Sequence, residues 1–259
     1  MSVSDSLPPS RVVAVANQKG GVAKTTTVAS LGAALAELGQ RVLLVDLDPQ
    51  ACLTFSLGID PEDLEVSLHH VLTKGLGATE VIVTSEEGVD LLPATIELAR
   101  AEVDLLTRTG REYVVRAALA DLDEYDWVLL DCPPSLGVLT VAALTAAGAV
   151  LIPLQCETLS HRGVGQLLDT VHDVRRFTNP GLEVWGVLPT LYDGRTRHAR
   201  AVLENISETY GLDVLQPPIP KTIRFAEAPA AGRSILGTSS RNKGAAAYRE
   251  LASSLLGRR

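Results

Sequence analysis

NQKGGVAKTT, residues 17–26, is the stretch that decides the fold of this chain. It follows the apolar run VVAVA at residues 12–16, which is typical of a buried parallel strand. It precedes residues 25–38, where apolar and small side chains recur at helical spacing. Loop amides and the start of the helix would together favour a bound anion, so this order predicts a phosphate-binding loop. The alternative is a glycine-rich turn with two surface lysines.

The loop departs from the usual pattern G-x-x-x-x-G-K-[ST]. Lys24 and Thr25 supply its lysine and hydroxyl, but Lys19 and Ala23 stand where the pattern has glycines. The general chemistry of these loops predicts that Lys24 reaches the β- and γ-phosphates and that Thr25 ligates Mg²⁺. Thr26 would donate a hydrogen bond to the α-phosphate.

What remains, K-G-G-x-x-K-T-T, resembles the deviant Walker A loop of the ParA/MinD family of ATPases. In that family the first lysine crosses an ATP-sandwiched dimer to the partner's nucleotide. The resemblance therefore implies that Lys19 acts in trans, as an arginine finger does. The simpler interpretation is a solvated lysine at the mouth of the loop. The implied nucleotide-binding residues of the loop are Lys19, Gly20, Gly21, Val22, Ala23, Lys24, Thr25 and Thr26.

Two carboxylates follow the next apolar run. Residues 41–48 read RVLLVDLD, so Asp46 and Asp48 leave a predicted buried strand on the same side. Ligands of open α/β sheets bind at this end of the strands. With Pro49 and Gln50 the stretch resembles the family's VDxDPQ motif, which implies that Asp48 positions the attacking water and that Asp46 lies near Mg²⁺. The alternative is a strand that ends in an Asp-Pro turn.

A third motif, WVLLDCPPS at residues 127–135, resembles the family's Walker B strand and D-x-P-P turn. The resemblance implies that Asp131 holds Mg²⁺, through a water. The two prolines end the strand and stiffen a segment that would act as a switch. Alone the motif is weak evidence, but the three motifs follow the family's order. They imply ATP, ADP and Mg²⁺ as cofactors, and as catalytic residues Lys19, Lys24 and Asp48.

Strand-like runs alternate with helical patterns along the chain. This alternation predicts an α/β, single-domain P-loop NTPase fold with a largely parallel twisted sheet and helices on both faces. The predicted strands are residues 12–16, 42–45, 89–92, 128–130, 149–154 and 184–188. The predicted helices are residues 25–38, 96–106, 112–122, 136–147, 163–177, 197–210 and 242–256. We expect residues 1–10 to be disordered and residues 11–259 to form the ATPase domain.

The composition fits one α/β domain of 259 residues with 46% apolar side chains. Cys52, Cys132 and Cys156 show no paired or metal-binding spacing, and neither do the five histidines. The first residues are polar and do not read as a signal peptide. We therefore expect the protein to lie in the reducing cytoplasm. Residues 132–156 contain no charged side chain. Prolines and glycines interrupt them, so a helix and a buried strand explain the stretch better than a membrane span.

Charge is distributed unevenly. The net charge of −8 argues against bulk attraction to nucleic acid, but the balance is −13 for residues 1–159 and +5 for residues 160–259. The sequence therefore allows a basic surface built from the C-terminal third.

Two segments of this third, LYDGR at 191–195 and IPKTIRFAEAP at 219–229, resemble chromosomal ParA, or Soj-like, proteins. The resemblance implies that Pro220 and Thr222 flank the adenine, although Lys221-Thr222 replaces the usual Arg-Asn. It also implies that Arg195 and Arg224 bind DNA phosphates without sequence preference, in a salt-dependent way. The alternative is a loop with solvated arginines. Further basic residues that would assist are Lys221, Arg197, Arg200, Arg241 and Lys243.

The resemblance as a whole implies a slow, partner-stimulated ATPase that partitions or positions DNA or other cargo. An ATP-dependent homodimer would bind double-stranded DNA non-specifically, a ParB-like protein would activate hydrolysis, and the protein would be cytoplasmic and nucleoid-associated. A MinD-like membrane-cycling ATPase is the alternative, but the tail at 248–259 reads as a final packed helix rather than a membrane anchor. An iron–sulfur carrier lacks its cysteine pairs, and a kinase or synthetase would need an acceptor pocket.

Overall fold

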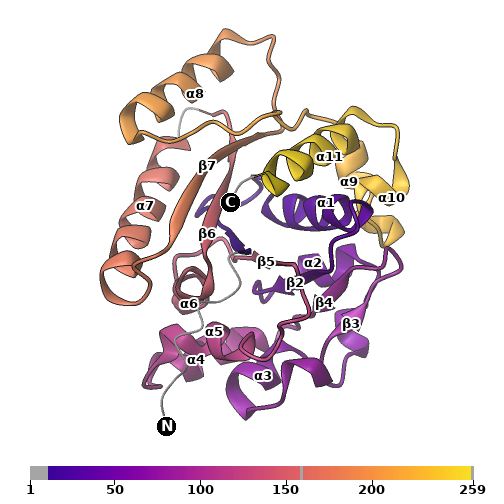
Figure 1. The fold of residues 1–259 in the computed structure, drawn as a ribbon, viewed down its shortest axis with the longest axis vertical. Coiled ribbons are helices and arrows are strands. Elements are labelled where there is room, and N and C mark those ends of the chain that lie inside the picture. Colours follow the sequence, from indigo (N-terminus) through magenta and orange to yellow (C-terminus); the bar gives the residue numbers. More distant parts are fainter. Residues whose placement is uncertain (1–10, 158–159, 258–259) are drawn as a thin grey trace.

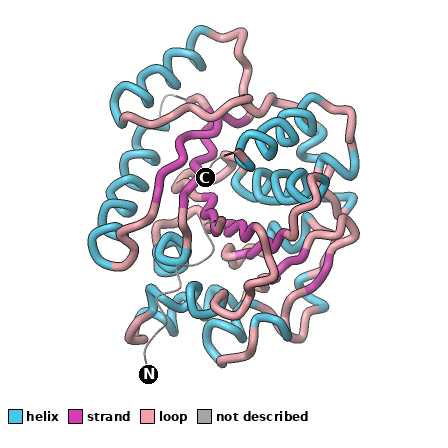
Figure 2. Tube along the Cα trace, in the orientation of Figure 1, coloured by secondary structure: helices cyan, strands magenta, loops and turns pink. Residues whose placement is uncertain are grey.

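The computed structural model describes residues 11–157 and 160–257, and the predicted disorder of residues 1–10 lies outside this part. Across the described residues, one seven-stranded sheet lies between two layers of helices, in the order β3-β4-β2-β5-β1-β6-β7 (Figures 1 and 2). All neighbouring strands are parallel except β3 and β4. The strands are β1 Val12–Val15, β2 Val42–Asp46, β3 Val83–Thr84, β4 Asp90–Leu92, β5 Trp127–Asp131, β6 Ala149–Gln155 and β7 Glu183–Thr190. The predicted fold class is confirmed.

The helices divide between the two faces of the sheet. They are α1 Lys24–Glu37, α2 Cys52–Ser56, α3 Leu68–Lys74, α4 Leu98–Leu106, α5 Val114–Ala118, α6 Val138–Ala146, α7 Ser160–Phe177, α8 Arg197–Tyr210, α9 Arg224–Glu227, α10 Ile235–Thr238 and α11 Lys243–Leu256. Along β1, Val12 and Ala14 belong to the core shared with α3 to α8, whereas Val13 and Val15 belong to the core shared with α1, α2 and α9 to α11. Alternation along each strand thus supplies both cores.

Most predicted elements are present, with one correction and several additions. The helix predicted at 112–122 is only a 3₁₀ turn, Arg111–Tyr113, followed by α5. It ends early because the chain returns to the sheet, where the amides of Asp126 and Trp127 donate to the Arg41 carbonyl at the start of β5. Sequence patterns did not predict β3, α2, α3, α9 and α10.

The final helix that the sequence predicts at residues 242–256 is present as α11. In α11, Tyr248, Leu251 and Leu255 are buried, and the helix lies along α1 (Figure 1). The Tyr248 hydroxyl shares a 2.9 Å hydrogen bond with that of Thr27 in α1. Within the residues that the structure describes, none of the helices has the length and apolar character needed to cross a membrane.

Both edges of the sheet are short or occupied. β3 has two residues and pairs antiparallel to β4. Beside β7, the Val187 amide donates to the Asp213 carbonyl and the Leu215 amide donates to the Val187 carbonyl, each at 2.8 Å. This approach depends on Gly186, because a Cβ there would lie 2.3 Å from the Asp213 oxygen. The segment after α8 therefore covers the outer edge of β7.

Candidate nucleotide and magnesium site

The predicted phosphate loop joins central strand β1 to α1. Gly21 and Ala23 both have left-handed backbones, with φ of 73° and 64°. The loop amides and the beginning of α1 thus meet at the carboxyl edge of the sheet, as a P-loop requires. Ala23 occupies the position of the second glycine of the ordinary pattern, and its φ explains why glycine is usual there.

Two buried polar side chains hold the loop in place. The Asn17 side-chain amide donates to the Pro153 carbonyl over 2.8 Å, and its oxygen accepts from the Lys19 amide over 3.0 Å. On the other side, the Thr190 hydroxyl donates to the Val22 carbonyl over 2.9 Å. The ends of β6 and β7 therefore anchor the loop.

Lys24 lies inside the loop, where the predicted phosphate-binding lysine should be. Its ammonium donates to the Lys19 carbonyl over 3.3 Å. Burial lowers the pKa of Lys24, and the negative charges of Asp131 and Asp48 act in the opposite direction. The ammonium is therefore partly desolvated and faces carboxylates, a setting that strengthens its attraction for a phosphate oxygen.

Asp131 ends β5 directly beside Asp46 at the end of β2. It is buried, and neither of its carboxylate oxygens makes a hydrogen bond to the described residues. Burial raises the pKa of this carboxyl well above its usual range and Asp46 adds to the rise, whereas the neighbouring Thr25 hydroxyl and Lys24 ammonium lower it. A buried carboxylate without a partner is costly, so the position suits a cation.

Asp46 is also buried, but its oxygens are occupied. Oδ2 accepts from the Thr54 amide over 2.9 Å and from the Thr54 hydroxyl over 2.8 Å, and Oδ1 accepts from the Asp48 amide over 3.2 Å. Burial raises the pKa of Asp46 to about 6, while these hydrogen bonds lower it. Asp48 is half-buried, and its Oδ1 accepts from the Gln50 amide over 2.9 Å.

The donor set fits Mg²⁺ rather than a transition metal. Carboxylates and a threonine hydroxyl are hard oxygen ligands. The described residues contain no group of three or more His, Cys, Asp or Glu side chains that could hold a metal by themselves. Mg²⁺ often takes one or two protein ligands and completes its shell with phosphates and waters, which agrees with this arrangement.

Lys19 is at the mouth of the loop and pairs with a residue of its own chain. Its ammonium donates to the Glu157 carboxylate and forms an ion pair with it. The side chain keeps 32% of its accessible surface, so solvent reaches the pair. Exposed ion pairs of this kind contribute little, about 0–1 kcal/mol, and a stronger anion can replace the glutamate.

The segment predicted to flank the adenine runs beside the end of β7. The Tyr192 amide donates to the Ile219 carbonyl over 2.9 Å, and Tyr192 forms a bridge with Pro220. Pro220 and Thr222 are half-buried. Because Thr190, two residues before Tyr192, holds the phosphate loop, this segment borders the candidate site.

The two arginines predicted to bind DNA come from neighbouring segments, since the Lys221 amide donates to the Tyr192 carbonyl. Arg195 is 90% exposed and makes a two-pronged ion pair with Asp193, with both N–O distances 2.9 Å. This pair lowers the pKa of Asp193 to about 2. Arg224 pairs with Glu227 over 2.7 Å.

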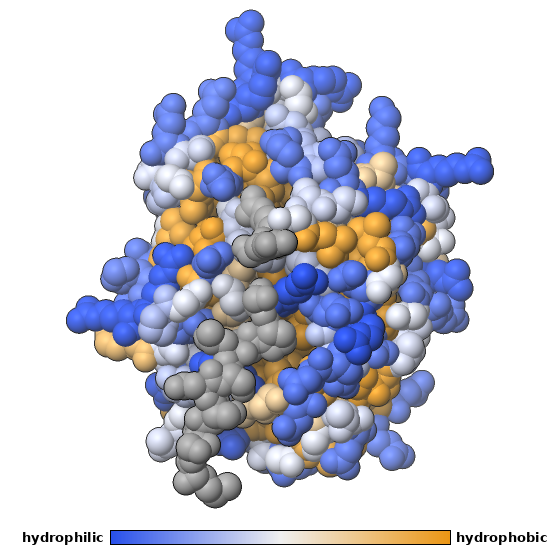
Figure 3. Space-filling view, viewed as in Figure 1, coloured by the Kyte–Doolittle hydropathy of each residue, from blue (hydrophilic) through white to orange (hydrophobic). Residues whose placement is uncertain are grey.

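All five of the predicted assisting residues are exposed, and all lie in the C-terminal third of the chain. Hydrophilic side chains project from the surface over α8, at the top of the view in Figure 3. The five residues are Lys221, Arg197, Arg200, Arg241 and Lys243. The acidic partners of Arg195 and Arg224 reduce the local positive charge, so a polyanion would have to displace them.

Comparison with known proteins identifies the family of this chain. The sequence model of a family described as an AAA domain matches residues 10–184. The sporulation initiation inhibitor protein Soj of Bacillus subtilis is 43% identical over 93% of this chain and 96% of its own length. The chromosome partitioning protein ParA of Caulobacter vibrioides is 42% identical over 96% of this chain and 95% of its own length. The chain belongs to the ParA/MinD family of deviant Walker A ATPases.

One solved structure of high similarity is named as a synthase rather than as a partitioning protein. Cobyrinic acid a,c-diamide synthase from Mycobacterium smegmatis, with bound ADP and magnesium, matches with a TM-score of 0.86 and 58% identity, over 95% of this chain and 94% of that one. A second structure of it holds an ATP analogue and magnesium. The nucleotides and the metal are those predicted for the ParA/MinD family from the loop.

Sequence analysis missed three residues that position the site: Asn17, Thr54 and Thr190. Each is buried and polar, and each makes hydrogen bonds to residues distant in the sequence. The only signal in the sequence is a polar residue within or next to an apolar run, which many surface positions share.

Proposed function

We propose that the chain is a ParA-type ATP hydrolase that partitions or positions a large cargo. The observation that carries the proposal is the convergence of Lys24, Asp131 and Asp46 at one edge of the sheet. Asp48 lies beside them, with its amide bonded to Asp46. The arrangement suits phosphoryl transfer, in which positioning and charge neutralisation supply most of the catalysis.

Each residue has a separate role in the proposed hydrolysis. The amides of residues 20–26 and the Lys24 ammonium would bind the phosphates, and Thr25 and Asp131 would hold Mg²⁺ with Asp46 behind them. Bound Mg²⁺ would neutralise charge on the β- and γ-phosphates. Asp48 would orient the attacking water, because its amide is bonded to Asp46 beside the metal site and its side chain stays partly solvated.

The proposed switch is a change of partner by Lys19. In the monomer it pairs with Glu157; in an ATP-sandwiched dimer it would reach the opposite subunit's nucleotide, whose several negative charges attract it more strongly than one exposed glutamate. The dimer would place two copies of Arg195 and Arg224 together, so that DNA is bound only in this state. A ParB-like protein would stimulate hydrolysis and release the DNA.

Sedimentation tests the cycle directly. With ADP the protein should remain monomeric, and with a slowly hydrolysed ATP analogue it should dimerise. Asp48→Ala should trap the dimer with ATP itself.

The role of Lys19 is tested by a turnover assay. Lys19→Ala should keep nucleotide affinity yet lose about 10³-fold in stimulated hydrolysis. Lys74→Ala, on the distant α3, serves as the control. Normal stimulated turnover in the Lys19 variant would refute the role in trans.

DNA retention tests the arginines. Charge reversal at Arg195 and Arg224 should abolish ATP-dependent retention on duplex DNA in a pull-down, with nucleotide binding unchanged. A matched reversal of the exposed Arg100 and Arg176, away from this surface, should leave retention intact. Equal retention by both double variants would reject the assignment and leave the hydrolase proposal standing.

The name of the Mycobacterium smegmatis relative raises amide synthesis as a second candidate, because that protein is 58% identical. A synthase would transfer phosphate to a substrate carboxylate, which needs an acceptor pocket beside the P-loop. Two cavities of the described surface, about 440 Å³ between α3 and α5 and about 470 Å³ beside the end of α1, are lined by none of the candidate site residues. Cobyrinic acid-dependent release of ADP with ammonia present would favour the synthase over the partitioning ATPase.

A further inference from the structure

The Thr54 side chain joins three elements at the edge of the candidate magnesium site. It lies on α2, completely buried. Its hydroxyl donates to Asp46 Oδ2, at the end of β2, over 2.8 Å. The same hydroxyl oxygen accepts from the Ala94 amide, just beyond β4, over 3.0 Å.

These contacts fix the direction of the hydroxyl proton. Because the Ala94 amide occupies one lone pair of the oxygen, the proton is free to point at Asp46. The Thr54 amide donates to the same carboxylate oxygen over 2.9 Å. Asp46 Oδ2 is thus held by two donors from one residue, which together fix the orientation of the carboxylate.

The orientation of the Asp46 carboxylate also affects Asp131 and Asp48. Asp46 lies directly opposite Asp131 across the β2–β5 pair, and its other oxygen accepts from the Asp48 amide. A rotation of the Asp46 carboxylate would therefore change the electrostatic environment of Asp131 and release the backbone of Asp48. Outer hydrogen bonds of this type orient the groups that hold a metal.

We propose that Thr54 is a positioning residue of the Mg²⁺ site, which sets Mg²⁺ affinity by holding Asp46 and tying it to α2 and β4. The proposal rests on the proposed function, since it assumes that Mg²⁺ binds with nucleotide at Asp131. It adds a residue of α2 that touches neither nucleotide nor metal.

Mg²⁺ titration of the protein with a fluorescent ADP derivative tests this role. Thr54→Val keeps the shape and removes the hydroxyl, so half-saturation should need about 10–100 times more Mg²⁺. Thr54→Ser restores the hydroxyl and should return half-saturation to within about threefold of the parent. ADP affinity in EDTA should be equal in all three proteins, which a merely structural defect would not produce.

A matched control is Thr145→Val. Thr145 is equally buried and shares a 2.9 Å hydrogen bond with Thr178 far from the site, so its loss should lower stability without changing the Mg²⁺ requirement. A folded Thr54→Val protein with the parent's Mg²⁺ requirement would overturn the positioning role. Absence of Mg²⁺-dependent ADP binding in the parent would instead overturn the proposed function, and this role with it.

A second measurement covers the case in which Thr54→Val does not fold. In the parent protein, the threonine methyl signals can be followed by NMR as Mg²⁺ is added to the ADP complex, and Thr54→Ser identifies the Thr54 signal by its loss. We expect the Thr54 methyl to shift and the Thr145 methyl to stay in place. An unmoved Thr54 methyl would contradict the proposal.

Discussion

Ala23 has a strained backbone because it stands where the common P-loop pattern has a glycine. Its φ of 64° lies in the left-handed region, which side chains with a Cβ rarely adopt. The Ala23 carbonyl nevertheless accepts from the Thr27 amide over 2.9 Å, so the residue begins the hydrogen bonding of α1. The strain is therefore held in place by the helix that follows.

Ala23→Gly should relieve that strain. We expect the free energy of unfolding of the nucleotide-free protein to rise by about 0.5–1 kcal/mol, because glycine adopts this φ without a steric penalty. Urea denaturation measures the change. Ala36→Gly, inside α1, is the control and should instead lower stability by about 1 kcal/mol. A loss of stability in both variants would show that Ala23 is not strained.

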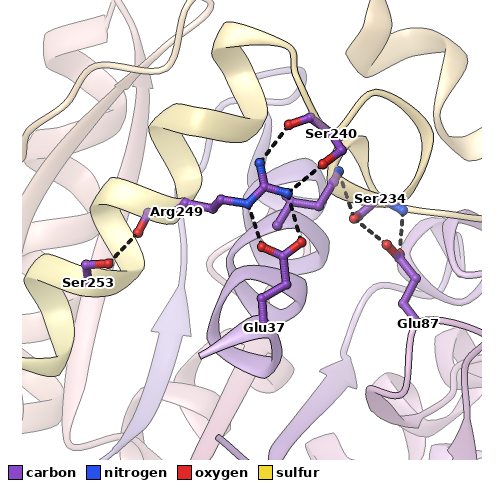
Figure 4. Close-up of polar contacts among 7 residues, drawn as sticks. Glu37, Glu87, Ser234, Ser240, Arg249 and Ser253 are labelled. Atoms are coloured by element: carbon purple, nitrogen blue, oxygen red, sulfur yellow. Dashed lines mark hydrogen bonds and ion pairs between the residues drawn. The ribbon is translucent and has the colours of Figure 1, made fainter. Parts of the chain in front are cut away.

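Short elements of the C-terminal third are held to the rest of the chain by polar contacts (Figure 4). Arg249 of α11 donates to both oxygens of Glu37, at the end of α1, and to Ser240. Glu87, in the turn between β3 and β4, accepts from the amide and the hydroxyl of Ser234 over 2.6 and 2.8 Å. The hydroxyl of Ser234 also accepts from the Leu236 amide and caps α10.

Ser234→Ala should remove both the cap of α10 and one contact to Glu87. We expect a loss of about 1–2 kcal/mol in the free energy of unfolding, measured by urea denaturation. Ser253→Ala is the control, since the exposed Ser253 hydroxyl only donates to the Arg249 carbonyl within α11. Equal effects of the two changes would mean that the Glu87 contact does not hold α10 to the sheet.

What the sequence could predict differs between long and short elements. Asp46, Asp48 and Asp131 were found because each follows an apolar run that reads as a strand, and strand ends of a parallel sheet share one edge. The four-residue α9 and α10 and the two-residue β3 are too short to show a period. The hydrogen bonds of Thr54, Asn17 and Thr190 span 40, 136 and 168 residues, and no local pattern reports such a distance.

At the scale of the whole molecule, the two buried carboxyls make stability depend on pH. Burial raises the pKa of Asp46 from the ordinary 3.8 to about 6 and raises that of Asp131 in the same direction. The folded state therefore holds protons that the unfolded state has already released. The contribution of these two carboxyls to the stability of the apo protein therefore falls as pH rises from about 4 through 6, and the part from Asp46 is on the order of 3 kcal/mol.

Unfolding in EDTA between pH 4 and pH 7 measures this loss. Buried His69 has a lowered pKa and acts in the opposite direction in the same window, so the parent must be compared with Asp46→Asn. The variant should lose less stability than the parent as pH rises. Mg²⁺ and ADP together should stabilise the parent more at pH 7 than at pH 5, because the cation needs ionised carboxylates. Parallel pH profiles for parent and variant would contradict the assignment.

The edges of the sheet have a consequence for how copies of this chain can associate. An open strand edge invites a second molecule to add its own strand, which leads to fibrils. In the described part of the chain, β3 offers two residues and the outer side of β7 is taken by Asp213 and Leu215. The described edges of the sheet therefore leave little unpaired strand to which a second copy could add in an uncontrolled way.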